Sequence, residues 1–147
     1  YGMTKGQPSP TTEPDWSSKL APGGTGLKEF HPLVIALASG ANFIARAFSG
    51  DPNGCASLIA EAVRHPGFSF IEVLSPCVTF RPEQREWKTR AHPAPVEPTD
   101  DPGRAARRLM TDDGFNIGVL YQGHRAPYRS GPAGAQSLEE LECQFRL

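Results

Sequence analysis

The stretch from residue 31 to residue 80 alternates between helical and strand patterns, and this order constrains the fold more than any other feature. Residues 32–38 are predicted to form a short buried helix, and residues 41–48 a strand. A second helix is predicted to begin after Asp51, because Asp is a favoured N-cap and Pro52 suits the first helical position. Residues 68–74 are β-branched and aromatic, which is typical of a strand. The order favours an α/β fold whose mostly parallel sheet is flanked by helices.

Within the second predicted helix, apolar residues recur at helical spacing. They are Leu58, Ile59, Ala62 and Val63. On either side of this regular part the chain is richer in loop-forming residues. Residues 7–32 and the proline-containing stretch 81–101 are predicted to be loop and extended chain. Residues 102–111 are predicted to form a helix, residues 115–121 a strand, residues 123–134 a loop, and the residues after Ser137 a last helix.

Composition excludes some classes of protein. The 147 residues suit one domain or a large piece of one. A net charge of −1 argues against a non-specific nucleic-acid binder, which needs a basic surplus. No apolar run is long enough to span a bilayer, so no membrane contact is expected. Cys55, Cys77 and Cys143 have no CxxC spacing, which favours a reducing, cytoplasmic location over a disulfide framework.

The opening loop, YGMTKGQ at residues 1–7, carries groups that could bind an anionic ligand. Gly2 and Gly6 permit a close approach of the backbone. Thr4 can donate to a phosphate, and Lys5 supplies a compact positive charge. On composition alone, a surface loop with a solvated lysine is the more common explanation.

Three segments together resemble one known family. They are YGMTKGQ with SPTT (residues 1–7 and 9–12), ASGA with FIAR (38–41 and 43–46), and HPGFSFIEVLSPC (65–77). In this order they are similar to the β subunit of 2-oxoacid:ferredoxin oxidoreductases. The resemblance is close over residues 1–80. It is looser over 81–147, where Trp87, the DDGF stretch at 112–115 and Tyr121 still resemble the family.

The resemblance implies part of a thiamine-diphosphate-binding fold. Residues 1–80 would be the C-terminal part of that domain, and residues 81–147 a family extension with a helix, a strand and a helix. In this family the β subunit holds thiamine diphosphate, Mg²⁺ and a [4Fe–4S] cluster. A 2-oxoacid is decarboxylated, the acyl group passes to coenzyme A, and electrons leave through the cluster to ferredoxin.

The same resemblance implies an α subunit as partner. Because the chain begins at Tyr1 in the middle of a motif, it is expected to be the downstream part of a longer polypeptide and to be inactive alone. The Gly-Asp-Gly segment and the asparagines that hold Mg²⁺ and diphosphate in the family do not occur before the loop. No catalytic residue is therefore predicted in this chain.

The resemblance assigns roles to the opening loop. Gly2, Met3 and Thr4 would flank the thiamine cofactor. Lys5 would face an anion, either the distal carboxylate of the 2-oxoacid or a coenzyme A phosphate. A lysine at this place favours a dicarboxylic substrate such as 2-oxoglutarate.

Cys77 has two interpretations. A single cysteine at the end of a strand is usually a small buried side chain, and a [4Fe–4S] cluster needs four ligands. The resemblance, however, implies that Cys77 is the remote fourth ligand of the cluster. Cys55 and Cys143 fall in predicted helices and are interpreted as structural thiols.

Basic residues follow Cys77 closely. They are Arg81, Arg85, Lys88 and Arg90. Ferredoxins are usually acidic, and complementary charge speeds association, so this stretch is a hypothetical ferredoxin-docking surface. Because Glu83 and Glu86 are interleaved, a solvated loop is an equal alternative.

Other polar residues are given structural roles. The four histidines are scattered without ligand spacing and are predicted to lie in turns or on the surface. The acidic pairs at 100–101 and 112–113 are predicted to cap helices.

Two other functions stay open at this point. One is a non-redox thiamine-diphosphate-dependent decarboxylase, which would need no cluster. The other is a non-catalytic α/β interaction domain whose proline-rich segments bind partners.

Overall fold

The computed structural model describes residue 1, residues 3–126 and residue 143. Its elements, in chain order, are α1 (Pro32–Ala38), β1 (Phe43–Phe48), α2 (Pro52–Arg64), β2 (Ser69–Leu74), the 3₁₀ helix η1 (Pro82–Glu86), α3 (Trp87–Arg90), β3 (His92–Pro93), α4 (Pro102–Thr111) and β4 (Asn116–Gln122). Among these residues, no helix has the length and apolarity needed to cross a bilayer. The loop predicted at the start of the chain is confirmed, since residues 3–31 form turns without helix or strand.

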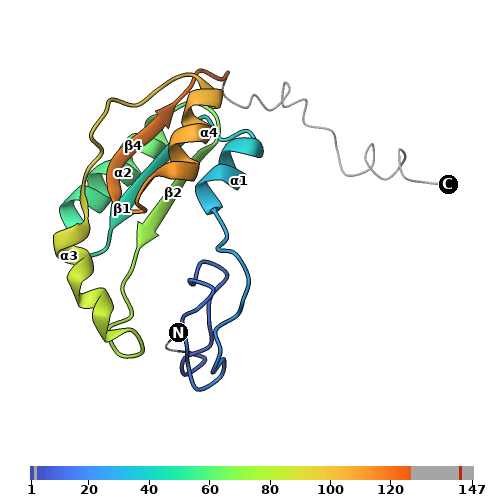
Figure 1. Ribbon diagram of the computed structural model, residues 1–147. Helices are drawn as coiled ribbons and strands as arrows, with labels where there is room; N and C mark the ends of the chain where they lie inside the picture. The colour runs from blue at the N-terminus through green and yellow to red at the C-terminus, as the bar shows by residue number, and fades with distance from the viewer. Residues whose placement is uncertain (2, 127–142, 144–147) are drawn as a thin grey trace.

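The strands form one sheet in the order β2-β1-β4-β3 (Figure 1). β1 and β2 are parallel, with Phe43 opposite Ser69 and Phe48 opposite Leu74. The α/β class and this predicted parallel pair are confirmed. β4, however, runs antiparallel to β1. The reason is that α4 ends at the carboxyl end of β1, where Asp112 pairs with Arg46, so the chain enters β4 there and runs back.

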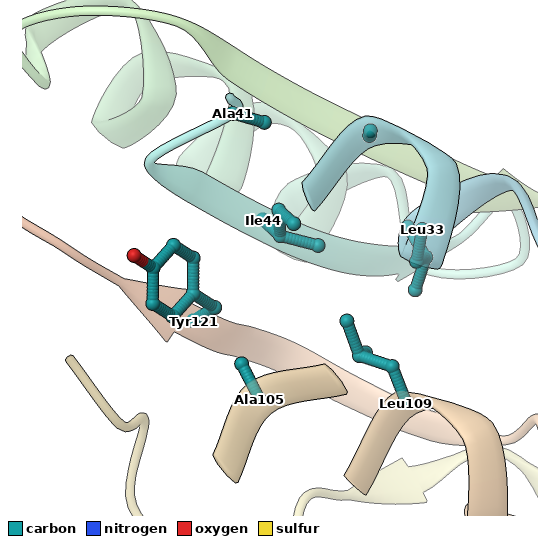
Figure 2. Packing of buried hydrophobic residues seen from close by; sticks show 7 residues of the cluster. Leu33, Ala41, Ile44, Ala105, Leu109 and Tyr121 are labelled. Atoms are coloured by element: carbon teal, nitrogen blue, oxygen red, sulfur yellow. The ribbon is translucent and has the colours of Figure 1, made fainter. Parts of the chain in front are cut away.

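Helices cover both faces of the sheet. α1 and α4 pack on one face, where Leu33, Ile44, Leu109 and Tyr121 belong to the larger apolar core (Figure 2). α2 packs on the opposite face through Ala62, against β1. Successive side chains of β1 alternate between these faces, as strand geometry requires. The polar residue Arg46 therefore lies on the same face as Ile44.

The sequence patterns of α2 and α4 are largely confirmed. The Asp51 carboxylate accepts from the Gly54 N–H at 3.0 Å, so Asp51 is the N-cap of α2 as predicted. The predicted apolar stripe of α2 is wrong in part. Ile59 is 47% exposed and Val63 is 80% exposed, because the helix packs on the sheet through the side that carries Leu58 and Ala62.

The stretch after β2 is more regular than predicted. Residues 82–90 form the consecutive helical turns η1 and α3, so the prediction of extended chain is wrong there. The Trp87 ring packs edge-on against Phe115 at a centroid distance of 5.6 Å, and the Arg90 guanidinium lies 3.9 Å from the Phe115 ring centroid. This tertiary contact accounts for the helix. The predicted loop 123–134 and the last predicted helix lie largely outside the described residues.

Candidate functional site

The N-terminal segment, Tyr1 with residues 3–30, meets the turn that follows β2 (Figure 1). The contact is built around Arg81. One guanidinium nitrogen donates to Glu13 Oε2 at 2.8 Å and to the Tyr1 hydroxyl at 3.2 Å, and the other terminal nitrogen donates to Glu13 Oε1 at 3.3 Å. Arg81 Nε donates to Glu83 Oε1 at 2.5 Å. These groups, with Trp16, are called the Arg81 cluster below.

Aromatic rings cover the same guanidinium. The Arg81 carbon Cζ lies 4.7 Å from the centroid of the Trp16 ring, within the range of a cation–π interaction. Tyr1 and Trp16 pack edge to face at 5.1 Å. The Tyr1 hydroxyl is also hydrogen-bonded to Oγ1 of the buried Thr12 at 2.5 Å. The two rings therefore shield the ion pair from water. Through Tyr1 and Trp16, they also attach two separate points of the N-terminal segment to Arg81.

The charges in the Arg81 cluster stabilise one another. Burial works against the charge of Arg81, but hydrogen bonds to Glu13, Glu83 and Tyr1 outweigh it and hold its pKa above the usual value. The hydrogen bond from Arg81 lowers the pKa of Glu13. Burial opposes the charge of Glu83, yet the same guanidinium lowers its pKa as well. All three groups are therefore charged at neutral pH.

Cys77 lies in the turn that leads from β2 to η1. Its N–H donates to Oε1 of the buried Gln84 at 2.8 Å, and its carbonyl accepts from the Arg81 N–H at 2.8 Å. The thiol is free and half-buried. It lines a cavity of about 630 Å³. Among the described residues, no three His, Cys, Asp or Glu side chains gather to form a metal site, so further ligands of a cluster at Cys77 would have to come from outside these residues.

The cavity next to Cys77 is acidic. Its lining includes Glu13, Glu29, Glu72, Asp112 and Asp113 together with Arg46 and Arg81. Both arginines are already paired with two carboxylates each. The lining is therefore unfavourable for an anion such as a coenzyme A phosphate.

Arg46 forms a second buried ion cluster at this cavity. It donates from Nε to Glu72 Oε2 at 2.6 Å and from a terminal nitrogen to Asp112 Oδ2 at 2.5 Å. Burial opposes its charge, but Glu72 and Asp112 keep its pKa above the usual value. Arg46 was not predicted as a site residue, although a charged side chain inside an apolar strand is itself a signal, since buried charges are usually paired.

Residues 3–6 of the predicted cofactor loop, the opening loop of residues 1–7, lie beside the Cys77 turn but do not line the cavity, whereas Tyr1 of the same loop does. Met3 is 99% exposed, and Thr4 and Lys5 are exposed as well. Lys5 has a φ of 58° and Gly6 a φ of 103°, so the loop turns sharply in the left-handed region. Gly6 is buried against Phe80, where an added Cβ would lie 3.3 Å from Cδ1 of the ring. Gly2 lies outside the described residues.

Other candidates have structural contacts. The Cys55 thiol lies in α2, as predicted, and donates to the Phe48 carbonyl at 3.1 Å. Asp101 caps α4 as predicted, by accepting from the Arg104 N–H at 2.7 Å. Asp112 follows α4 but pairs with Arg46, which the capping interpretation did not foresee. His92 lies on the surface, as predicted, and its Nε2 is 3.0 Å from Asp113 Oδ2.

The predicted ferredoxin-docking surface is wrong at one residue, Arg81. Arg81 is 6% exposed and paired with Glu13 and Glu83, so it offers no charge to a partner. Arg85, Lys88 and Arg90 are exposed. The basic residues of this stretch therefore divide into one buried residue and three surface residues.

Comparison with known proteins identifies relatives. No protein-family model matches the chain. It is 31% identical over 137 residues to 2-oxoacid:ferredoxin oxidoreductase subunit beta of Saccharolobus solfataricus, which covers 83% of this chain and 45% of that protein. It is 39% identical over 80 residues to 2-oxoglutarate oxidoreductase subunit KorB of Mycobacterium tuberculosis, covering 54% of this chain and 21% of that protein.

A solved structure shows the same fold over nearly the whole chain. It is 2-oxoglutarate:ferredoxin oxidoreductase from Magnetococcus marinus with 2-oxoglutarate, coenzyme A and succinyl-CoA bound. The TM-score is 0.73 at 32% identity, and the match covers 99% of this chain and 49% of the solved one. The match thus spans about half the length of the Saccharolobus solfataricus and Magnetococcus marinus proteins. The resemblance predicted from the sequence is confirmed: this chain is a homologue of the β subunits of 2-oxoacid:ferredoxin oxidoreductases.

Proposed function

We propose that this chain forms part of the β subunit of an enzyme that oxidatively decarboxylates a 2-oxoacid. The product is the acyl-CoA, and the electrons pass to ferredoxin. The observation that carries the proposal is the likeness across 99% of the chain to an oxidoreductase that holds 2-oxoglutarate, coenzyme A and succinyl-CoA. The proposed function also includes an α subunit as partner and a cytoplasmic location.

The cofactor loop would contact thiamine diphosphate, which when bound stabilises the carbanion left by decarboxylation. Gly2, Met3 and Thr4 are the residues of this chain assigned to it. The Thr4 hydroxyl is exposed, and its hydrogen bond to the Tyr1 carbonyl is long at 3.5 Å. It can therefore turn to donate to a ligand. Because the described residues form no group of acidic metal ligands, Mg²⁺ would be held by residues elsewhere.

Cys77 is proposed as one thiolate ligand of a [4Fe–4S] cluster, which accepts electrons one at a time. The half-buried thiol at the wall of a cavity supports this role, because a cluster ligand must be reachable and yet shielded from bulk water. The other three ligands would lie outside this chain's described residues.

Lys5 is proposed to bind the distal carboxylate of 2-oxoglutarate. The acidic lining of the neighbouring cavity supports this, since an exposed ammonium is a better partner for an anion than arginines already paired with carboxylates. In the complete enzyme, we expect Lys5→Ala to raise KM for 2-oxoglutarate about tenfold, or about 1.4 kcal/mol. The substitution should change KM for a monocarboxylic 2-oxoacid less, and Lys19→Ala should leave both unchanged. Equal effects on both substrates would contradict the role.

The proposed activity is tested with the full gene product and its α subunit. We expect reduction of methyl viologen only when 2-oxoglutarate and coenzyme A are both present. Decarboxylation that needs neither coenzyme A nor an electron acceptor would indicate the non-redox decarboxylase instead. If no partner subunit copurifies and thiamine diphosphate does not bind, the interaction domain is the better explanation.

Ferredoxin docking is proposed at the exposed residues Arg85 and Lys88. Reversing both charges should slow ferredoxin reduction at low salt and weaken its salt dependence, because such residues act on the association rate. Reversal of Arg107, which is exposed on α4, serves as the control. An unchanged rate and salt dependence would remove the docking role.

A further inference from the structure

We propose that Arg81 is a positioning residue that holds the loop of residues 3–6 against the Cys77 turn. The inference rests on the proposed function, in which that loop contacts the thiamine cofactor and substrate and Cys77 binds the cluster. Its consequence is that a single side chain fixes how the two sites lie relative to each other.

Arg81 is attached to both sides of this contact. On the Cys77 side, its backbone N–H donates to the Cys77 carbonyl, and its own carbonyl accepts from the Gln84 N–H at 2.9 Å. On the other side, its guanidinium binds Glu13, which is 68 positions away in the chain. The backbone of Arg81 thus belongs to the Cys77 turn, whereas its guanidinium belongs to the contact with the N-terminal segment.

Tyr1 transmits the attachment to the loop. Its carbonyl accepts from the Gly6 N–H at 2.9 Å and so closes the loop, while its hydroxyl and ring lie in the Arg81 cluster. Gly6 packs on Phe80, the residue just before Arg81. The loop is thus held at both of its ends, by the polar cluster and by an apolar contact.

The cluster needs an arginine. The guanidinium donates in three directions, to Glu13, Glu83 and Tyr1, and its Cζ lies over the Trp16 ring. A lysine has one nitrogen and cannot reproduce this fork. Without the guanidinium, the carboxylates of Glu13 and Glu83 would repel each other, which would push the N-terminal segment away from the turn.

The effect should be local rather than global. The side chains of Glu13 and Glu83 are 51% and 54% exposed, so solvent screens their attraction to Arg81. Loss of the cluster should therefore release the N-terminal segment without unfolding the sheet.

The test uses the complete enzyme with Arg81→Gln, Arg81→Lys and Glu13→Gln, and Arg107→Gln as the control on the exposed face of α4. Trypsin cleavage after the exposed Lys5 and the change in tryptophan fluorescence relative to the wild type, to which Trp16 contributes, report on the loop without any assay of activity. We expect both Arg81 variants to be cleaved at least tenfold faster, with red-shifted emission. Glu13→Gln should lie between them and the wild type, and the control should match the wild type.

Two functional quantities are then measured for each variant: KM for the 2-oxoacid and the iron content of the cluster. The Arg81 variants should show at least a tenfold rise in KM for 2-oxoacid while retaining wild-type iron. Neither the lysine variant nor added substrate should restore the wild-type cleavage rate. Unchanged cleavage and emission, or faster cleavage with unchanged KM, would overturn the positioning role.

Two safeguards keep the outcomes distinct. If Arg81→Gln does not fold, Glu13→Gln and Tyr1→Phe test the same contacts, and wild-type cleavage, emission and KM in both would overturn the inference. A wild-type enzyme without 2-oxoacid turnover contradicts the proposed function itself. An active wild type indistinguishable from the Arg81 variants contradicts only the role of Arg81.

Discussion

Two buried arginines, each paired with two carboxylates, join different parts of the molecule. Arg46 lies inside the sheet, and its partners Glu72 and Asp112 are 20% and 13% exposed. Arg81 lies at the edge, and its partners Glu13 and Glu83 are about half exposed. The first cluster connects β1, β2 and the end of α4, whereas the second connects an irregular segment to a turn.

The same chemistry therefore serves two purposes. Where both carboxylates are shielded, removal of the arginine leaves uncompensated charge in the protein interior, so the cluster stabilises the fold. Where the carboxylates reach water, they can rehydrate, and the cluster fixes position more than stability. The comparison predicts different outcomes for equivalent substitutions at the two sites.

The largest effect is expected at Arg46. Arg46→Gln should lower the free energy of unfolding by about 3–5 kcal/mol, because Glu72 and Asp112 would remain shielded and unpaired. Denaturant unfolding of the full gene product measures the change. Arg107→Gln on the exposed face of α4 should stay within about 0.5 kcal/mol. A loss at Arg46 no larger than at Arg107 would refute the distinction.

Removal of an apolar side chain should likewise cost more stability in the sheet than in the N-terminal segment. Ile44 is fully buried in the sheet, whereas Leu20 in the N-terminal segment is 61% exposed. Ile44→Ala should cost about 2–5 kcal/mol and Leu20→Ala under about 0.5 kcal/mol. The pair is compared by thermal unfolding. Comparable losses would show that the N-terminal segment has a core of its own.

The smallest effect is expected at the surface pair of His92 and Asp113. The hydrogen bond that the His92 ring donates to the Asp113 carboxylate, and then its hydrogen bond to the Pro93 carbonyl, raise the pKa of His92 above 6.5. Because this pKa is raised on folding, the stabilisation is fully present below pH 6.5 and is lost as the pH rises through the folded value. Titration of the His92 ring by NMR should show a pKa above 6.5 that falls in Asp113→Asn. An equal pKa in both proteins would exclude the pairing.

The fold was largely predictable because its elements follow local rules. Asp51 with Pro52 and Asp101 with Pro102 mark helix starts by capping chemistry that is contained within a few residues. The helix at 82–90 was not predictable in this way, because its stability depends on Trp87 contacting Phe115, a residue distant in the sequence. Local patterns do not contain such contacts.

The predicted site residues came only from the segments that carry the family resemblance, and their roles stay predictions. The resemblance pointed to the opening loop and to Cys77, and the structure brings their neighbours Gly6 and Phe80 together. The burial of Arg81 could not be foreseen, because its partner Glu13 lies in a loop whose path no local pattern determines. Charge spacing alone therefore placed Arg81 on the surface.

The most direct measurement is the iron content and electron paramagnetic resonance spectrum of the complete enzyme after Cys77→Ser, with Cys55→Ser as the matched control. The proposed function predicts that the control retains its iron and its 2-oxoglutarate-reducible signal, whereas Cys77→Ser loses or alters both. A Cys77→Ser enzyme with the iron content and spectrum of the wild type would contradict it.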